Sequence, residues 1–320
     1  QPDPVGGRRG GRCHPPQACI RKETGLRTAK WKEYELIDTS DGERLERWGS
    51  VVLIRPDPQI IWKTPRENPL WEKADAHYLR SASGGGHWRE NRPVPPMWRI
   101  HYGELTFQLK TMGFKHTGIF PEQAVNWDFA MEKIRSAKRP VRVLNLFGYT
   151  GAATLACALA GASVCHVDAS RGMVAWAKEN AAACGLADRP VRWLVDDCVK
   201  FVRRERRRGN VYDGIIMDPP SYGRGPGGEV WKLEEELYPL VELCGPLLSE
   251  HPLFFLLNSY TAGLSPSVMA YLLGILVRKK HGGSVAADEI GLPVTQSGLV
   301  LPCGSTAVWQ SGDSIGFNQF

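Results

Sequence analysis

The chain has 320 residues, of which 42% are hydrophobic and 23% are charged, and its formal net charge is +6. This composition is that of an average globular protein, so it excludes a wholly disordered chain, a collagen and a coiled coil. No apolar run reaches the roughly 18 residues of a membrane span, and the start of the chain contains no signal-peptide core, so we expect a cytoplasmic protein without a membrane partner.

The first third of the chain changes character once. Residues 1–16 are dominated by Gly, Pro and Arg and have too little apolar surface to offset the entropy of ordering, which predicts a disordered arm over residues 1–33. The next segment holds short β-prone runs such as SVVLIRP and LTFQLK, broken by Pro, Gly and Asp. This pattern predicts a small β-rich domain over residues 34–110.

Beyond Pro140, apolar runs of strand length alternate with stretches of helix length, which is typical of a doubly wound, parallel α/β sheet. Strands are expected at 141–147, 162–168, 191–195, 212–218 and 252–258. Helices are expected near 151–160, 170–184, 197–208, 229–249 and 265–280. Two further strand-like runs lie within 284–310 around a turn, so we predict a Rossmann-like domain over 111–310 with an antiparallel last strand, and a tail at 311–320.

The first predicted strand ends in the segment NLFGYTG, residues 145–151. Gly148 and Gly151 would let the backbone pass close to a ligand, and the helix that follows offers unpaired N–H groups. The spacing is G-x-x-G, so the G-x-G-x-x-G fingerprint of a dinucleotide site is absent. Taken alone, the segment is more typical of a tight strand-to-helix turn.

Acidic residues follow the next two predicted strands. Asp168 ends the second strand, where its carboxylate could accept both hydroxyl groups of a ribose. Asp196 and Asp197 end the third strand, where a carboxylate could accept the exocyclic amine of adenine, with Cys198 as an apolar neighbour of the ring. A single acid at a strand end is commonly a helix cap, but ligands of open α/β sheets bind outside the carboxyl ends of the strands, so the series predicts a nucleoside site.

The most specific motif is DPPSYG at residues 218–223, which ends the fourth predicted strand. Two prolines, Pro219 and Pro220, fix the backbone without offering an N–H donor, which leaves the Asp218 carboxylate and the Pro219 carbonyl as acceptors for a planar nitrogen base. Tyr222 could stack on that base, and residues 223–228 would form a mobile lid. The predicted catalytic residues are therefore Asp218, Pro219, Pro220 and Tyr222.

With these motifs the chain resembles the class I S-adenosylmethionine-dependent methyltransferases, and within them the large-subunit ribosomal RNA methyltransferase I/K group. The resemblance extends over residues 99–310 and includes FKHTGIFPEQAVNW (114–127) and VDAS (167–170) beside the motifs above. It implies that S-adenosylmethionine is the cofactor, that the 114–127 stretch lies over its methionine end, and that RNA is the partner. The implied cofactor-binding residues are Lys115, Thr117, Gln123, Asn145, Phe147, Gly148, Gly151, Asp168, Ala169, Asp196, Asp197 and Asp218.

One departure from this group concerns cysteine. The C5-methylating members keep a nucleophilic Cys just after the fifth strand, where this chain reads LLNSYTAGLS (256–265) without a thiol. Cys198 and Cys303 could reach the site only if the fold brought them there, and we expect them to be small buried thiols. The sequence therefore favours transfer to nitrogen or another heteroatom, where orientation suffices without a covalent adduct.

Several alternatives stay open from the sequence. Cytosine C5 methylation, a protein or small-molecule acceptor, a nucleotide-dependent oxidoreductase and an RNA-binding module without turnover each fit part of it. The eight cysteines lack the paired spacing of a zinc site, so no metal is expected. The stretch KFVRRERRR (200–208) is as typical of a solvated helix end, where cations are favourable, as of a surface that contacts RNA phosphates.

Overall fold

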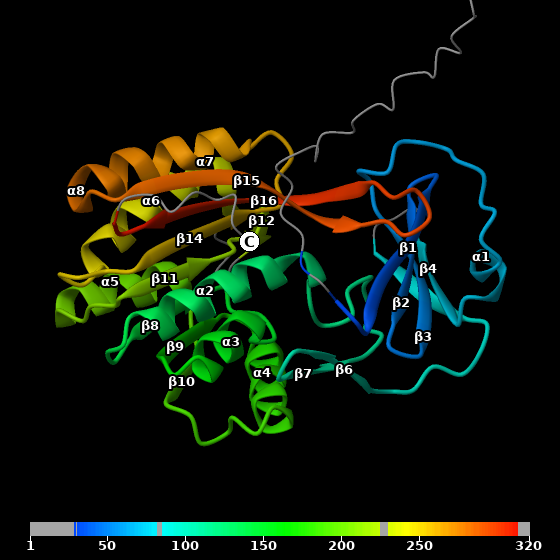
Figure 1. Cartoon of the computed structure of the whole chain (residues 1–320), viewed down its shortest axis with the longest axis horizontal. Coiled ribbons are helices and arrows are strands. Elements are labelled where there is room, and N and C mark those ends of the chain that lie inside the picture. Colours follow the sequence, from blue (N-terminus) through cyan, green and yellow to red (C-terminus); the bar gives the residue numbers. More distant parts are fainter. Residues whose placement is uncertain (1–28, 30, 82–84, 225–229, 313–320) are drawn as a thin grey trace, which may run out of the picture.

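The computed structural model describes residues 29, 31–81, 85–224 and 230–312. Most of the expected arm, lid and tail therefore lie outside the described residues. The described part consists of a large helix-covered sheet and a smaller β-rich unit beside it (Figure 1). No helix in these ranges is long and apolar enough to cross a membrane, and they contain no cluster of three or more His, Cys, Asp or Glu residues placed to hold a metal ion.

The large sheet has seven strands in the order β10-β9-β8-β11-β14-β16-β15. The first five strands in this order are parallel, and β16 runs antiparallel to both of its neighbours, which confirms the predicted fold class. The strands are β8 (Arg142–Leu146), β9 (Ser163–Asp168), β10 (Val191–Val195), β11 (Gly214–Met217), β14 (Phe254–Ser259), β15 (Ser284–Pro293) and β16 (Val300–Gln310).

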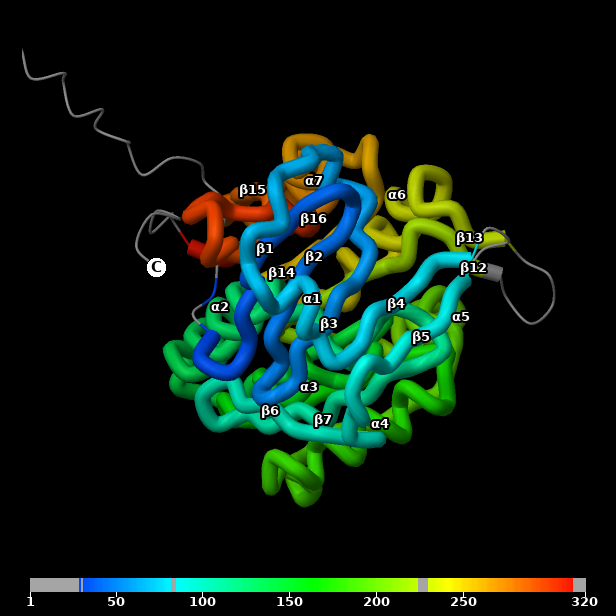
Figure 2. Tube along the Cα trace, turned by 90° about the vertical axis from the view of Figure 1, so that its right-hand side faces the viewer, coloured from blue at the N-terminus to red at the C-terminus, as the bar shows by residue number. Residues whose placement is uncertain are grey.

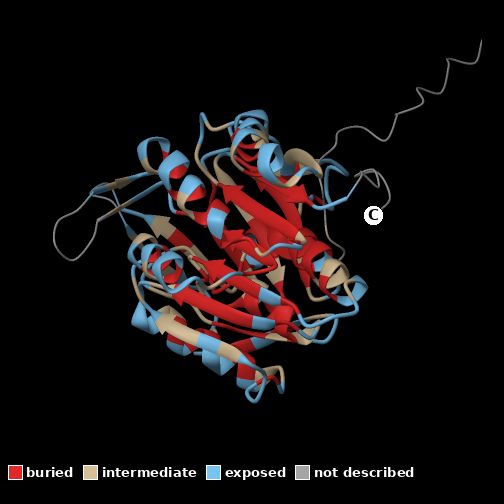
Figure 3. Ribbon diagram, turned by 90° about the vertical axis from the view of Figure 1, so that its left-hand side faces the viewer, coloured by how far each residue is buried: buried red, intermediate tan, exposed pale blue. Residues whose placement is uncertain are grey.

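Helices cover both faces of the large sheet. Successive residues of the β14 strand alternate between two cores: Phe255 and Leu257 pack with α5, α6 and α7, whereas Phe254 and Leu256 pack with α2 and α3. The central strands are consequently buried while the outer faces of the helices are exposed (Figure 3). The helices are α2 (Ala124–Ser136), α3 (Ala152–Leu159), α4 (Arg171–Ala183), α5 (Cys198–Arg208), α6 (Leu233–Cys244), α7 (Pro266–Leu273) and α8 (Lys279–His281).

Three local differences from the predicted elements have physical reasons. Helix α2 was not expected, because it carries several polar residues that tertiary packing buries, among them Asn126. The helix expected from residue 229 begins only at Leu233, since β13 (Val230–Lys232) pairs with β12 (Tyr222–Arg224) as a hairpin. The helix expected over 265–280 is interrupted by a π-helical turn at Gly274–Arg278.

The smaller unit is a five-stranded sheet in sequential strand order, accompanied by a separate hairpin (Figure 2). Its elements are β1 (Tyr34–Ser40), β2 (Glu43–Trp48), β3 (Val51–Pro56), α1 (Leu70–Lys73), β4 (Ala76–Arg80) and β5 (Gly86–Glu90), and the hairpin consists of β6 (Trp98–Tyr102) and β7 (Leu105–Leu109). These strands account for the β-rich character expected between residues 34 and 110.

A shared core joins the two units. Trp48 of the small sheet, Phe107 of the hairpin and Leu155 of α3 belong to one cluster of buried apolar residues. The long β15–β16 hairpin also reaches the small sheet, where the Thr295 N–H donates to the Leu36 carbonyl at 3.0 Å. The small sheet is thereby held next to the end of the large sheet at which β8, β9 and β11 terminate (Figure 1).

Candidate active site

The carboxyl ends of the central parallel strands meet at one edge of the sheet, where ligands of open α/β sheets bind. Backbone hydrogen bonds draw the loops together: the Gly148 N–H donates to the Val167 carbonyl at 3.0 Å, and the Asp196 N–H to the Asp168 carbonyl at 3.0 Å. A pocket opens at this edge. The predicted site residues that line it are Gln123, Asn145, Phe147, Gly148 and Asp218.

The loop between β8 and α3 depends on its two glycines. A Cβ atom on Gly148 would lie 2.3 Å from Cε1 of His166, and Gly151 caps α3 with a φ of 88°. Phe147 and Tyr149 also have positive φ angles, 58° and 51°, which residues with side chains rarely adopt. Backbone strain of this kind persists where the surroundings enforce it, and it clusters at ligand sites.

A buried chain of hydrogen bonds supports the loop between β8 and α3. Asn145 Nδ2 donates to Thr154 Oγ1 at 2.8 Å, and Thr154 Oγ1 lies 2.9 Å from His166 Nδ1. Burial lowers the pKa of His166 to about 4, so the ring is neutral at pH 7. The Asn145 side chain therefore forms the floor of the pocket, fixed by the protein itself.

Asp168 lies at the end of β9 beside the glycine loop. Its carboxylate accepts the N–H of Tyr149 at 2.9 Å and the N–H of Ser170 at 2.8 Å. Burial raises the pKa of Asp168, and the two backbone hydrogen bonds oppose that effect. Each bond uses one lone pair on a different oxygen, so both oxygens can still accept a ribose hydroxyl. Its neighbour Ala169 is exposed.

The two acids after β10 have different surroundings. Asp197 is exposed and caps α5, because its carboxylate accepts the Lys200 N–H at 2.8 Å. Asp196 is half-buried and forms an ion pair with Arg204. Neither residue lines the pocket described above, but both lie at the same sheet edge, next to Asp168.

Asp218 directly follows β11 and is the acidic residue that lines the pocket. Burial and the negative charge of Glu122 raise the pKa of Asp218 to about 7. Pro219 is buried, whereas the exposed Pro220 accepts a hydrogen bond from Trp231 Nε1 at 2.6 Å. The backbone after Asp218 is thereby fixed by two proline rings and by a bond to the β12–β13 hairpin.

Tyr222 is not among the residues that line the pocket. It belongs to β12, pairs with Lys232 of β13, and leaves 53% of its surface exposed. Residues 225–229 of the expected lid lie outside the described residues. Other aromatic residues, Phe120, Phe147 and Tyr149, line the pocket together with Asp218.

Those aromatic side chains form a series from the surface to the pocket. Phe114 is 44% exposed, and its ring centroid lies 5.8 Å from that of His116. The series continues from His116 to Phe120 at 5.2 Å, and from Phe120 to Tyr149 at 5.5 Å and Tyr260 at 5.6 Å. Phe120 and Tyr149 line the pocket, so a planar ring could stack along this series.

A polar network that sequence reasoning missed borders the same pocket. Gln123 Nε2 donates to the Tyr260 hydroxyl at 2.9 Å, while Asn126 Nδ2 contacts Gln123 Oε1 at 2.9 Å and Asn258 Oδ1 at 3.0 Å. Glu122 is buried, and its Oε2 has no hydrogen-bond partner among the described residues. Asn258 could have been found as the polar residue that interrupts the apolar run of β14.

Lys115 and Thr117, both expected over the cofactor, have separate environments. Lys115 Nζ donates to the Pro56 carbonyl at 3.2 Å, which ties this stretch to the small sheet, and burial lowers the pKa of Lys115 to about 8. Thr117 is fully buried, and its hydroxyl has no partner among the described residues. The adjacent Gly118 carbonyl accepts the hydroxyl of Thr150, which brings Thr117 next to the glycine loop.

The two cysteines considered from the sequence are both buried. Cys198 is the first residue of α5 and packs in the core, and Cys303 donates a hydrogen bond to the Leu301 carbonyl at 3.4 Å. Burial raises the pKa of both thiols, which keeps them protonated. The described residues that line the pocket include no cysteine.

Comparison with known proteins gives a consistent result. Residues 73–244, more than half of the chain, match the family described as S-adenosylmethionine-dependent methyltransferase. A crystal structure of the S-adenosylmethionine-dependent methyltransferase from Agrobacterium tumefaciens is 36% identical, covers 90% of this chain and 93% of its own, and has a TM-score of 0.85. A Streptococcus mutans protein of the same assignment shares the fold, with 19% identity, 88% and 76% coverage and a TM-score of 0.64.

A curated relative matches a shorter segment. The ribosomal RNA large subunit methyltransferase K/L of Shewanella baltica is 37% identical over 117 residues, which are 36% of this chain and 16% of that relative. The matched segment is thus a small part of the relative's length, and its name agrees with the group that the sequence motifs resemble. By its family match and its long alignment with the Agrobacterium structure, this chain belongs to the S-adenosylmethionine-dependent methyltransferases.

Proposed function

We propose that this chain methylates a nitrogen atom of a base in RNA and does so without a cysteine adduct. The observation that carries the proposal is the environment of Asp218. A carboxylate and the Pro219 carbonyl stand at the end of β11 as hydrogen-bond acceptors, and the described residues that line the pocket include no thiol. A carbon acceptor needs a nucleophile that adds to the ring, whereas a nitrogen acceptor has its own lone pair.

The residues at this edge fit the cofactor of the family. Asp168 keeps acceptor capacity for ribose hydroxyls, and Gly148 and Gly151 let the loop pack closely against His166 and Ala177. The buried hydroxyl groups of Thr117 and Tyr149 lack partners among the described residues, which suits a polar ligand between the 114–127 stretch and the glycine loop. When bound, S-adenosylmethionine supplies an electrophilic methyl group on a positively charged sulfur.

Asp218 would serve as acceptor for the amine of the base. Its carboxylate would orient an N–H group and stabilise the positive charge that grows on nitrogen during transfer. With a pKa of about 7, the same carboxylate could also take the proton that the methylated nitrogen releases. The Pro219 carbonyl would accept a second N–H of the same amine.

RNA is the favoured substrate class for two reasons. The series of rings from Phe114 to Tyr149 offers stacking surfaces to an unpaired base, and such stacking is the usual way in which proteins hold bases outside a helix. The chain also carries a net charge of +6, and its curated relatives are named as ribosomal RNA methyltransferases. The test below also detects methylation of protein or of a small molecule.

The direct test follows the methyl group. Purified protein with methyl-labelled S-adenosylmethionine is incubated separately with total RNA, with protein and with small-molecule extracts, and labelled RNA is digested to nucleosides for mass spectrometry. Label on a base nitrogen supports the proposal, whereas label in protein or on a ring carbon contradicts it. Asp218→Asn should lower turnover by about 10²-fold with little change in cofactor affinity. Asp188→Asn, at an exposed position, is the matched control.

A second experiment addresses the cysteine question. Cys198→Ser and Cys303→Ser should keep most of the activity, because neither thiol lines the pocket. RNA that contains 5-fluorocytosine traps enzymes that form a covalent adduct with the ring. A trapped complex that disappears in either variant would assign the chain to carbon methylation instead.

A further inference from the structure

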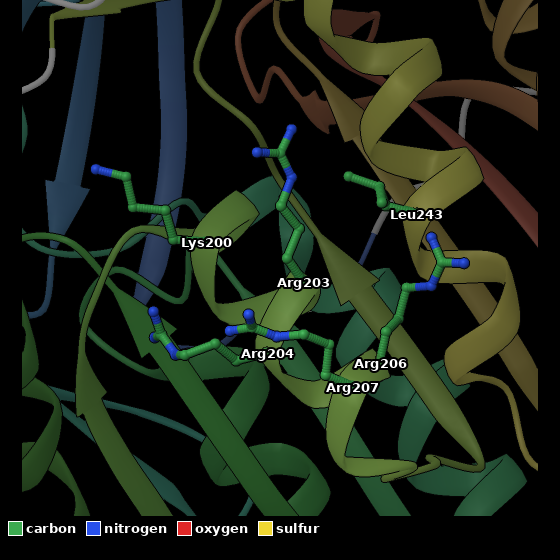
Figure 4. Close-up of a pocket in the computed structure, with 6 residues that line it drawn as sticks. All are labelled: Lys200, Arg203, Arg204, Arg206, Arg207 and Leu243. Atoms are coloured by element: carbon green, nitrogen blue, oxygen red, sulfur yellow. The ribbon is translucent and has the colours of Figure 1, made fainter.

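We infer that a groove between α5 and α6 binds the phosphate backbone of the RNA substrate, an inference that rests on the proposed function. The groove has a volume of about 640 Å³ and is lined by cationic side chains of α5 and by Leu243 of α6. Figure 4 shows the cationic side chains fanning out from one helix, with Leu243 of α6 on the side of Arg206. The residues concerned are Lys200, Arg203, Arg204, Arg206 and Arg207.

The amphipathic pattern of α5 accounts for this concentration of charge. Phe201, Val202 and Glu205 are buried against the sheet, so the remaining positions must face outward. Glu205 is the acidic residue within the basic run, and it points inward, where it accepts the Tyr212 hydroxyl at 2.7 Å. The outward face of α5 therefore presents cations without acidic residues between them.

Helix electrostatics alone do not explain the cations. Basic residues are favourable in the last turn of a helix, which covers Arg206 and Arg207 but neither Lys200 nor Arg203. Lys200 lies in the first turn, where the helix dipole disfavours a positive charge, and Arg203 stands three and four residues from Arg206 and Arg207. Like charges at these spacings destabilise a helix, so the face carries its charge at a cost in stability.

The ion pairs of the described residues neutralise only part of the arginine charge on this face. Arg204 is paired with Asp196, but Arg203, Arg206 and Arg207 form no ion pair with any residue in the part of the chain that the structure describes. Guanidinium groups bind phosphate oxygens through two parallel N–H donors, and they are the usual choice for nucleic-acid backbones. Leu243 is the one apolar residue among those that line the groove.

The groove begins at the active-site edge of the sheet. Helix α5 starts directly after Asp197, and α6 starts after the β12–β13 hairpin that follows Asp218. Lys200, in the first turn of α5, is therefore the groove residue next to the site, whereas Leu243 lies in the last turn of α6. With 11 residues, α5 is roughly 16 Å long, enough to contact several successive phosphates of a strand whose target base enters the pocket.

The test compares two variants with the same charge loss. The groove variant carries Lys200→Gln, Arg203→Gln and Arg207→Gln. The control carries Arg278→Gln, Lys279→Gln and Lys280→Gln, which are exposed positions at the end of the π-helical turn and in α8. Glutamine keeps the helix propensity of the replaced residues. Melting temperature and calorimetric cofactor affinity, which should match those of the unmodified protein, verify that both variants are folded.

The readout is the affinity for a fluorescein-labelled oligouridine at several salt concentrations. We expect the groove variant to bind at least about tenfold more weakly at 50 mM salt. Its salt slope should fall by about 2, because each phosphate that the protein neutralises on a single strand adds about 0.7 to that slope. The KM for RNA should rise with kcat largely unchanged. The control should bind like the unmodified protein.

The outcomes separate this inference from the proposed function. If the unmodified protein methylates RNA and the groove and control variants bind RNA equally well, the groove inference is wrong and the proposed function stands. If the unmodified protein neither binds nor methylates RNA, the proposed function fails, and the groove inference fails with it. If the groove variant instead loses methylation of an acidic protein acceptor, the assignment to an RNA backbone is wrong.

Discussion

The protonation state of Asp218 should govern the pH dependence of methyl transfer. Burial and the charge of Glu122 raise the pKa of Asp218 to about 7, and only the ionised form can accept hydrogen bonds from an amine through both oxygens. Activity should therefore fall as the pH drops through 7. At pH 6, one unit below this pKa, about one tenth of the carboxyl groups are ionised, so kcat/KM should be about tenfold below its plateau.

Two substitutions test this assignment in opposite ways. Asp218→Asn removes the titrating group, so the remaining activity should no longer change between pH 6 and 8. Glu122→Gln removes the charge that adds to the effect of burial, so the pKa of Asp218 should fall and the acidic limb of the profile should move to lower pH. At pH 6 the Glu122→Gln variant should therefore keep a larger fraction of its own plateau activity than the unmodified protein does. A general loss of structure would not produce this result.

The measurement is kcat/KM with limiting cofactor, because this quantity reports the free enzyme. Values of kcat should show a lower apparent pKa, since the positive sulfur of the bound cofactor stabilises a nearby carboxylate. A profile of the unmodified protein that stays flat from pH 5.5 to 8 would refute the reasoning. So would an acidic limb near pH 7 that persists in the Asp218→Asn variant.

Two further predictions concern the glycine loop and the basic helix. Gly148→Ala should weaken cofactor binding at least about tenfold, because the new Cβ would lie 2.3 Å from His166, whereas Gly172→Ala, with its nearest neighbour 3.9 Å away, should leave calorimetric affinity unchanged. Glu205→Gln should lower the free energy of unfolding by about 1–3 kcal/mol at pH 7, as measured by urea denaturation. Burial raises the pKa of Glu205, but its hydrogen bonds from Tyr212, Asn210 and Arg208 outweigh burial, so the pKa in the folded protein is lowered overall. The stabilisation by the carboxylate is therefore present above the pKa of the unfolded chain and is lost as the pH falls through the lower pKa of the folded protein. An equal effect of the substitution at pH 7 and pH 3 would contradict this prediction.

The fold was predictable because local sequence dictates it. Strand β10, at the edge of the sheet, occupies the predicted residues 191–195, and the other parallel strands differ from their predicted bounds by only a few residues. The central strands β8, β11 and β14 are apolar runs buried on both faces and bounded by polar or turn residues, so no tertiary information is needed to find them. Helix α2 illustrates the limit, because Asn126 is buried in it by contacts with Gln123 and Asn258 that the sequence does not display.

The candidate site was predictable only where its residues are strand ends. Asp168 ends β9 and Asp218 directly follows β11, so the parallel topology brings them to one edge. Glu122 and Tyr260 adjoin the pocket residue Gln123 from segments far apart in the chain, and their contact depends on how α2 packs against β14. Lys115 was expected above the cofactor, but its ammonium group hydrogen-bonds the Pro56 carbonyl, which reflects the docking of the small sheet.

The two elements proposed to recognise RNA differ in rigidity, and this difference suits their tasks. The segment after Asp218 is held by two prolines, by the bond from Trp231 and by a hydrogen bond of 2.6 Å between Thr261 Oγ1 and Ser221 Oγ. Acceptors held in this way need no reorganisation when positive charge develops on the nitrogen in the transition state. Such preorganised electrostatic stabilisation raises the rate of the reaction. The arginine side chains of α5 are long and mostly exposed, so their guanidinium groups can adjust to an RNA backbone of variable shape. Loss of the cations should therefore weaken substrate binding, whereas loss of the Asp218 carboxylate should slow turnover.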